Sequence, residues 1–212
     1  MQRYLVNSSA APIPPELRRS LQGVDTATIG HFEFFGFVDN AIRPVFSARA
    51  CGTAVTVVAV GRDGSVIYRA IDLLREGDFL VVARVDRDDV SCIGGGVAAA
   101  LKVKGAAGVI VDGPCTDVNE LREIGVPVWC TGVSAKATSR AIAIGGAINV
   151  PIACGGCAVL PGYAVLADEE GAFVADAARM EAAAAAALAR QERSTRVRTH
   201  LAAGRSIFDF PE

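Results

Sequence analysis

The chain has 212 residues, of which 51% are hydrophobic and 21% are charged, and its formal net charge is −2. A nearly neutral chain of this length and hydrophobicity can bury a sizeable core, and it lacks the positive field that holds nucleic acid. Four arginines near the C-terminus alternate with other residues along a predicted helix, so we interpret them as a solvated face. Composition therefore predicts a single domain over residues 1–212 that binds no nucleic acid.

Neither a signal peptide nor a membrane span is predicted. The first twenty residues contain three prolines and no apolar run of the length that a signal peptide needs. Residues 141–167 carry no charge, but glycines and prolines divide them into pieces too short for a transmembrane helix. We therefore expect a cytoplasmic protein that makes no contact with a membrane.

Strands and helices alternate in the predicted structure of residues 54–130. Residues 54–60 form a strand, and Ser65 is placed to cap an amphipathic helix that Gly77 ends. Then come, in order, strand 79–83, a polar loop at 84–89, helix 97–104, strand 108–111, a helix between Asp117 and Gly125, and strand 127–130. This β-α-β-α-β order is typical of parallel strands joined by right-handed crossovers.

Short strands separated by glycine and proline turns are predicted after residue 146. Their ranges are 147–153, 158–160, 163–167 and 172–175, and together they form a second, all-β layer. An alanine-rich helix then carries Met180, Ala184 and Leu188 on one face and stops at Gly204. The resulting α/β protein ends in a helical extension over residues 176–204, of a kind that commonly packs on a neighbouring subunit.

Six cysteines are spread through the chain, and we expect them to be reduced and mostly buried. Cys154 and Cys157 form a C-x-x-C sequence. A redox or metal-binding motif of this kind normally opens a helix or has a second pair, whereas this one lies between prolines in an apolar stretch. Buried thiols are the favoured interpretation, and a redox or metal role is the alternative.

Two helix N-termini are the features that point most directly to a ligand. Gly94, Gly95 and Gly96 precede one helix, where glycines let the backbone approach a ligand and unpaired N–H groups attract an anion. Thr116 and Asp117 precede the other and offer oxygen atoms to a hard cation. Together they predict a small anionic substrate near a divalent metal.

Both features have a second interpretation. Asp117 lies three residues before Glu120, as in a capping box, although a carboxylate can cap a helix and face a metal at once. Gly94, Gly96 and Ala99 fit the dinucleotide pattern G-x-G-x-x-A. A polar loop separates these glycines from the preceding strand, so nicotinamide binding stays a minor alternative.

The chain resembles the family of proteins similar to the regulator of ribonuclease E activity A, the RraA-like family. This family includes class II pyruvate aldolases that act on 4-hydroxy-4-methyl-2-oxoglutarate and 4-carboxy-4-hydroxy-2-oxoadipate. The resemblance covers most of the chain and rests on residues 52–57, 76–82, 104–113, 148–152, 161–162 and 167–171. It implies a swivelling β/β/α core and homotrimers, or homohexamers made of two trimers, with the site at a subunit boundary.

The resemblance also implies roles for individual residues. The amides of Gly94, Gly95, Gly96 and Val97 would hold the carboxylate of a pyruvyl group, and Asp117 would support Mg²⁺ or Mn²⁺ through water. The C-terminal helix would lend an acid, for which Glu192 is the candidate, to a neighbouring copy.

Two departures affect the expected activity, because Thr116 stands where the aldolases have arginine and Gly95 where they have an acid. We therefore expect a divalent-metal-dependent lyase for a small oxo or hydroxy acid, with weak standard pyruvate aldolase activity. The alternatives are a binding or regulatory protein without catalysis, a metal-dependent dehydratase or isomerase, and, least favoured, a nicotinamide-binding protein.

Overall fold

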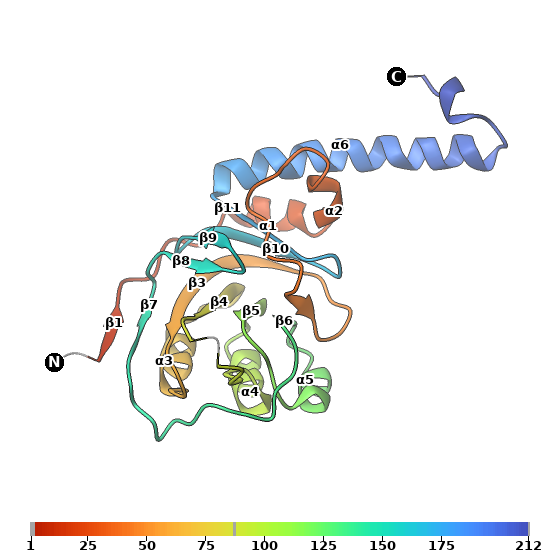
Figure 1. Ribbon diagram of the computed structural model, residues 1–212. Helices are drawn as coiled ribbons and strands as arrows, with labels where there is room; N and C mark the ends of the chain where they lie inside the picture. Colours follow the sequence, from red (N-terminus) through yellow and green to blue (C-terminus); the bar gives the residue numbers. More distant parts are fainter. Residues whose placement is uncertain (1–2, 87, 212) are drawn as a thin grey trace.

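The computed structural model describes residues 3–86 and 88–211. Four parallel strands form its centre: β3 (Ala50–Ala59), β4 (Asp78–Arg84), β5 (Gly108–Asp112) and β6 (Val128–Cys130). Helices α3 (Ser65–Leu73), α4 (Gly95–Val103) and α5 (Val118–Ile124) connect them and cover one face of the sheet (Figure 1). The predicted β-α-β-α-β segment is therefore confirmed.

The central strands are buried on both faces, which explains their continuous apolar sequences. Leu80 and Val82 of β4 belong to the core beneath the three helices. Phe79 and Val81 point the other way, into a second core that includes Trp129. The alternation of side chains along one strand thus joins two hydrophobic cores.

The outer strands extend the sheet beyond its parallel centre. On one side β3 pairs antiparallel with β10 (Ala164–Ala167) and with β7 (Gly146–Ile148). Strand β10 in turn pairs with β11 (Ala172–Ala175), and β7 pairs with β1 (Tyr4–Val6). On the other side β2 (Arg43–Pro44) pairs with β6. A separate hairpin is formed by β8 (Ile152–Cys154) and β9 (Cys157–Val159).

The predicted strand over residues 147–153 is wrong in its extent, because it divides into β7 and β8. Asn149, between them, has a φ of 56°, which an extended strand does not accommodate. Its side chain is buried and donates to the carbonyl of Asn7, so a contact with the N-terminal segment stabilises the bend. The apolar pattern alone gave no sign of this interruption.

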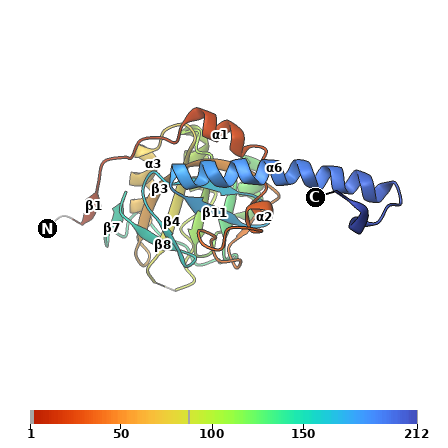
Figure 2. The same ribbon diagram turned by 90° about the horizontal axis from the view of Figure 1, so that it is seen from above.

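Three helices cover the β10–β11 side of the sheet. These are α1 (Pro15–Leu21), α2 (Thr26–Ile29) and α6 (Ala177–Ala202), whose inner residues pack with Phe173 and Leu166. Asp176 caps α6 by accepting from the N–H of Arg179. Helix α6 crosses this side and continues well beyond the body of the chain, towards the short helix η1 (Ile207–Asp209) (Figure 2). The predicted C-terminal helix is therefore confirmed.

Helix α3 begins differently from the prediction, because Gly64 occupies the N-cap position and Ser65 is the first helical residue. The carboxylate of Asp63 accepts hydrogen bonds from the N–H and the hydroxyl of Ser65. Asp63 therefore caps the start of α3, which is the role that we predicted for Ser65. Within the described ranges, no helix is long and apolar enough to cross a membrane.

Candidate functional site

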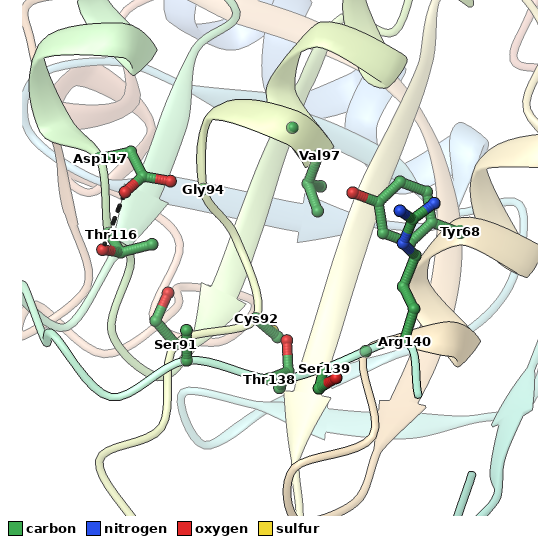
Figure 3. Close-up of a pocket in the computed structure, with 13 residues that line it drawn as sticks. Tyr68, Ser91, Cys92, Gly94, Val97, Thr116, Asp117, Thr138, Ser139 and Arg140 are labelled. Atoms are coloured by element: carbon green, nitrogen blue, oxygen red, sulfur yellow. Dashed lines mark hydrogen bonds between the residues drawn. The ribbon is translucent and has the colours of Figure 1, made fainter. Parts of the chain in front are cut away.

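A cavity of about 320 Å³ lies between the N-termini of α4 and α5 and the segment 137–140 (Figure 3). The predicted site residues Gly94, Gly96, Val97, Thr116 and Asp117 line it. Gly95 joins this group because its N–H donates a hydrogen bond to the carboxylate of Asp117. The structure therefore brings together all of the predicted substrate-binding residues and Asp117, which come from two loops more than twenty residues apart in sequence.

The start of α4 presents unpaired donors to the cavity. Gly94 is the N-cap in an extended conformation, and its carbonyl accepts from the N–H of Ala98. Within the described residues, the N–H groups of Gly96 and Val97 have no acceptor. Two backbone donors at the positive end of a helix are therefore free to bind an anionic group.

Asp117 does not cap its own helix, so the predicted capping box is wrong. The residue has a φ of 54°, and its side chain makes no cap hydrogen bond to α5. Instead, Oδ2 accepts from the N–H of Gly95 at 2.9 Å, and Oδ1 accepts from the hydroxyl of Thr116 at 3.3 Å. The carboxylate therefore binds the first residue of α4 directly, with Oδ1 only weakly engaged.

The glycines of this loop make room for carboxylates. A Cβ atom on Gly94 would lie 2.5 Å from Oδ2 of Asp117, closer than real Cβ atoms approach an oxygen. A Cβ atom on Gly95 would lie 1.7 Å from Oε2 of Glu120, from the first turn of α5, which is a severe clash. Asp117 and Glu120 thus flank the start of α4, and Glu120 fills the space that a side chain on residue 95 would need.

The opposite wall of the cavity is the segment 137–140, which hydrogen bonds hold in place. The N–H of Thr138 donates to the carbonyl of Ser91, and the N–H of Gly64 donates to the carbonyl of Ser139. Arg140 stacks on the ring of Tyr68, 5.1 Å from its centroid. The sequence analysis did not identify Arg140 or Tyr68, because this segment lacks a periodic pattern and contacts the site only through the tertiary fold.

Asp63 holds the residues that follow this wall in the chain. Its carboxylate accepts from the N–H groups of Ile144 and Gly145 and from the hydroxyl of Tyr4. Burial alone would raise the pKa of Asp63, but these bonds and those from Ser65 outweigh it and lower the pKa to about 2. Asp63 is therefore ionised at neutral pH and connects the start of α3 to β1 and to the segment that follows the cavity wall.

Three buried thiols lie close behind the site. Cys92 lines the cavity, and burial raises its pKa to about 11. Cys115 directly precedes Thr116, and the neighbouring thiol of Cys115 lowers the pKa of Cys130. Cys130 is therefore the more acidic thiol of this pair, although its side chain faces the interior.

The C-x-x-C sequence forms a tight turn. Cys154 and Cys157 are paired residues at the ends of β8 and β9, and the two glycines between them both have positive φ angles. All six cysteines are buried free thiols, and burial raises the pKa of Cys154 and Cys157. The prediction of buried thiols is confirmed, and the glycines serve the hairpin.

Glu192 lies away from this cavity in its own chain. It is an exposed residue of α6, which covers the β10–β11 side of the sheet, whereas α4 and α5 cover the opposite side (Figure 1). A role for Glu192 therefore requires a second copy of the chain.

The donor set suits a metal that keeps water ligands. Within the described residues, no group of three or more His, Cys, Asp or Glu side chains is arranged to hold a metal ion. Asp117 nonetheless offers an exposed carboxylate whose Oδ1 makes only a long hydrogen bond. One carboxylate among hydroxyl groups fits Mg²⁺ or Mn²⁺, which retain several waters in proteins.

Comparison with known proteins connects this cavity to a family. The family model for RraA-like proteins, described as Aldolase/RraA, matches residues 26–174, which include every residue of the cavity. The chain belongs to the RraA-like family. The resemblance inferred from the sequence is therefore confirmed, and the fold agrees with it.

Named relatives of this RraA-like chain include aldolases. A 4-hydroxy-4-methyl-2-oxoglutarate aldolase of Thermus thermophilus is 32% identical over 117 residues, which are 55% of this chain and 70% of that protein. A relative from Halalkalibacterium halodurans, whose name assigns the same activity provisionally, is 30% identical over 136 residues. That match spans 64% of this chain and 64% of the relative's length.

Solved structures of RraA proteins have the same fold. An unusual member of the RNase ES inhibitor RraA family from Streptomyces coelicolor matches with a TM-score of 0.76 and 28% identity, covering 87% of this chain and 96% of the other. The RNA-processing inhibitor RraA of Thermus matches with a TM-score of 0.59 and 27% identity over 65% of this chain and 83% of the other.

Proposed function

We propose that this RraA-like protein is a divalent-metal-dependent lyase that acts on a small oxo or hydroxy acid. The observation that carries the proposal is the meeting of Asp117 with the N-terminus of α4 in one cavity. There a carboxylate for a cation lies beside free backbone donors for an anion. The aldolase names of the relatives support the reaction class.

Asp117 would hold the metal, with water completing its coordination shell. Its Oδ1 is the weakly engaged oxygen, and the hydroxyl of Thr116 lies next to it. When bound, Mg²⁺ or Mn²⁺ would supply a positive charge that polarises the oxo group of the acid.

The chain's own residues bind and orient the acid. The N–H groups of Gly96 and Val97 would donate hydrogen bonds to its carboxylate at the positive end of α4. Thr116 offers only a hydroxyl, so this end of the cavity holds the carboxylate by neutral donors. An arginine would add charge-assisted bonds worth about 1.5–3 kcal/mol each, which is why we propose weak activity on standard aldolase substrates.

We also propose that the protein assembles as a homotrimer or homohexamer, with Glu192 entering the cavity of a neighbouring copy. The projection of α6 beyond the body of its own chain supports this proposal (Figure 2). Leu201 and Phe208, near the free end, expose apolar side chains that an isolated chain leaves in water.

Manganese binding tests the proposed function most simply. We expect the wild type to bind Mn²⁺, measured by water-proton relaxation, and oxalate to tighten that binding. Asp117→Asn should weaken Mn²⁺ binding by about tenfold or more, because it removes the only carboxylate charge that lines the cavity among the described residues.

The matched control is Glu123→Gln, which removes an exposed carboxylate from the same helix, α5. It should bind Mn²⁺ like the wild type. Equal binding by the wild type and Asp117→Asn would remove Asp117 from the metal site and overturn the proposal.

A regulatory role is the second candidate, and the match to RNase inhibitor proteins favours it. It predicts inhibition of a ribonuclease E preparation by the purified chain, with no dependence on Asp117. Inhibition that persists in Asp117→Asn, together with no effect of oxalate on Mn²⁺ binding, would favour this candidate over the lyase.

A further inference from the structure

Tyr68, from α3, presents a free phenolic hydroxyl to the cavity. Its side chain lines the cavity, and Figure 3 shows its hydroxyl oxygen directed towards the start of α4. The hydroxyl of Tyr4 is bonded to Asp63 and Ser65, whereas that of Tyr68 has no hydrogen-bond partner among the described residues. The proton of the Tyr68 hydroxyl is therefore available to a ligand.

The hydroxyl lies beside the place proposed for the carboxylate of the acid. A Cβ atom on Gly96 would lie 3.2 Å from the hydroxyl oxygen, so this oxygen neighbours one of the free backbone donors. The guanidinium of Arg140, 5.1 Å from the ring centroid, stacks on the ring and fixes its orientation. Because C3 of a 2-oxo acid is two bonds from the carboxylate carbon, a group at this position reaches C3 as well.

The reaction class needs a proton donor at this position. A lyase that cleaves an oxo acid between C3 and C4 must deliver a proton to C3. Of the described residues that line the cavity, those with titratable side chains are Tyr68, Cys92, Asp117 and Arg140.

Three of these four groups are unsuited to the transfer. The carboxylate of Asp117 accepts from the N–H of Gly95 and is the proposed metal ligand. A guanidinium does not release its proton in proteins, which excludes Arg140. Cys92 is only 3% exposed, so its thiol has little contact with the cavity. The hydroxyl of Tyr68 is the group that remains.

We propose that Tyr68 is a catalytic residue that transfers a proton to C3 of the oxo acid. When the C3–C4 bond breaks, its electron pair stays with the C3 fragment and forms the new C3–H bond with the proton of the Tyr68 hydroxyl. The hydroxyl on C4 gives its proton to water as C4 becomes a carbonyl carbon, and water returns a proton to the phenolate. This inference rests on the proposed function, because it takes the start of α4 as the site of the carboxylate.

Proton exchange tests this role without cleavage of a carbon–carbon bond. The group that protonates C3 in one direction removes a proton from C3 in the other, so the methyl hydrogens of pyruvate should exchange with D₂O. Proton NMR follows the loss of the methyl signal in the presence of Mg²⁺. We expect exchange by the wild type above the rate without protein, and Tyr68→Phe should lower the rate at saturating pyruvate by about tenfold or more.

Two comparisons separate proton transfer from binding and folding. Tyr68→Phe keeps the ring on which Arg140 stacks, so the half-saturating pyruvate concentration and the affinity for oxalate should change little. Tyr163→Phe removes a phenolic hydroxyl that lines a different cavity, and it should exchange pyruvate hydrogens like the wild type.

The outcomes distinguish this inference from the proposed function. Unchanged exchange in Tyr68→Phe, or a loss of oxalate affinity that matches the loss of rate, would overturn the catalytic role of Tyr68 alone. A wild type that binds Mn²⁺ and oxalate but exchanges no methyl hydrogens would also overturn it. Failure of the wild type to bind Mn²⁺ and oxalate would overturn the proposed function itself.

Discussion

At the scale of single residues, this site replaces side chains that its aldolase relatives are expected to use. The family resemblance implies that Thr116 takes the place of an arginine and Gly95 the place of an acid. The space beside Gly95 is filled by the carboxylate end of Glu120, and the guanidinium of Arg140 lies across the cavity. The charges are therefore present near the site but come from other elements.

Restoring both side chains tests the importance of this exchange. We expect the wild type to be weak as a pyruvate aldolase and oxaloacetate decarboxylase, and the double change Gly95→Asp with Thr116→Arg to raise the activity about tenfold or more. An aspartate at 95 must displace the end of Glu120, which is a flexible, exposed side chain and moves at little cost. Pyruvate release in the presence of Mg²⁺, coupled to lactate dehydrogenase, gives the rate.

Strong turnover by the wild type would show that Thr116 and Gly95 do not limit the reaction. No gain in a well-folded double variant would show that the replaced side chains act only together with other parts of the site. The single variants serve as controls, and each should gain less than the pair.

At the scale of elements, Asp63 connects a helix start, an edge strand and the segment that follows the cavity wall. Its pKa of about 2 lies below the value of an unfolded aspartate, so its ionised form stabilises the folded protein. This stabilisation is present above about pH 4 and is lost as the pH falls through 2.

Asp63→Asn should accordingly lower the free energy of unfolding by about 2 kcal/mol at pH 7. The difference from the wild type should shrink between pH 4 and pH 2, as followed by urea unfolding across that range. A difference that is independent of pH would mean that the lost contacts are steric and that the charge of Asp63 contributes nothing.

The elements that the sequence predicted correctly are those with strong local signals. The strands around Leu80 and Ile110 are continuous apolar runs, and the first half of α6 is alanine-rich, so burial or propensity alone identifies them. The break at Asn149 depends instead on a contact with Asn7, 142 residues away in sequence. Local patterns do not contain such contacts.

The site residues likewise divide into those that a local pattern identified and those that depend on distant contacts. The glycines before α4 and Asp117 were identified because helix starts have a recognisable composition. The partner of Asp117 was predicted wrongly, because the local pattern with Glu120 suggested a capping box, whereas the carboxylate bonds to Gly95 of another helix. Arg140 reaches the cavity only because its segment is bound to Ser91 and Gly64 across the fold.

At the scale of the whole molecule, the free half of α6 is the feature that a single chain leaves unexplained. The helix continues past the body, and Phe208 beyond it is 94% exposed. That residues 1–212 form one domain stays a prediction, and a single cooperative unfolding transition would support it.

Assembly can be measured directly. We expect light scattering of the purified chain at micromolar concentration to give the mass of a trimer or hexamer, because α6 and Phe208 gain an apolar partner only in another copy. Mixing Asp117→Asn with Glu192→Gln should restore part of the lost activity, since some mixed sites would carry neither change. A monomer would contradict both the assembly and the shared site.

The central claim is that the start of α4 and Asp117 form one site for a metal and an oxo acid. A crystal structure of the protein with Mg²⁺ and oxalate tests it most directly. The account predicts Mg²⁺ beside Oδ1 of Asp117, with water among its ligands, and oxalate on the N–H groups of Gly96 and Val97. Mg²⁺ and oxalate bound elsewhere, or a cavity that stays free of both at saturating concentrations, would contradict it.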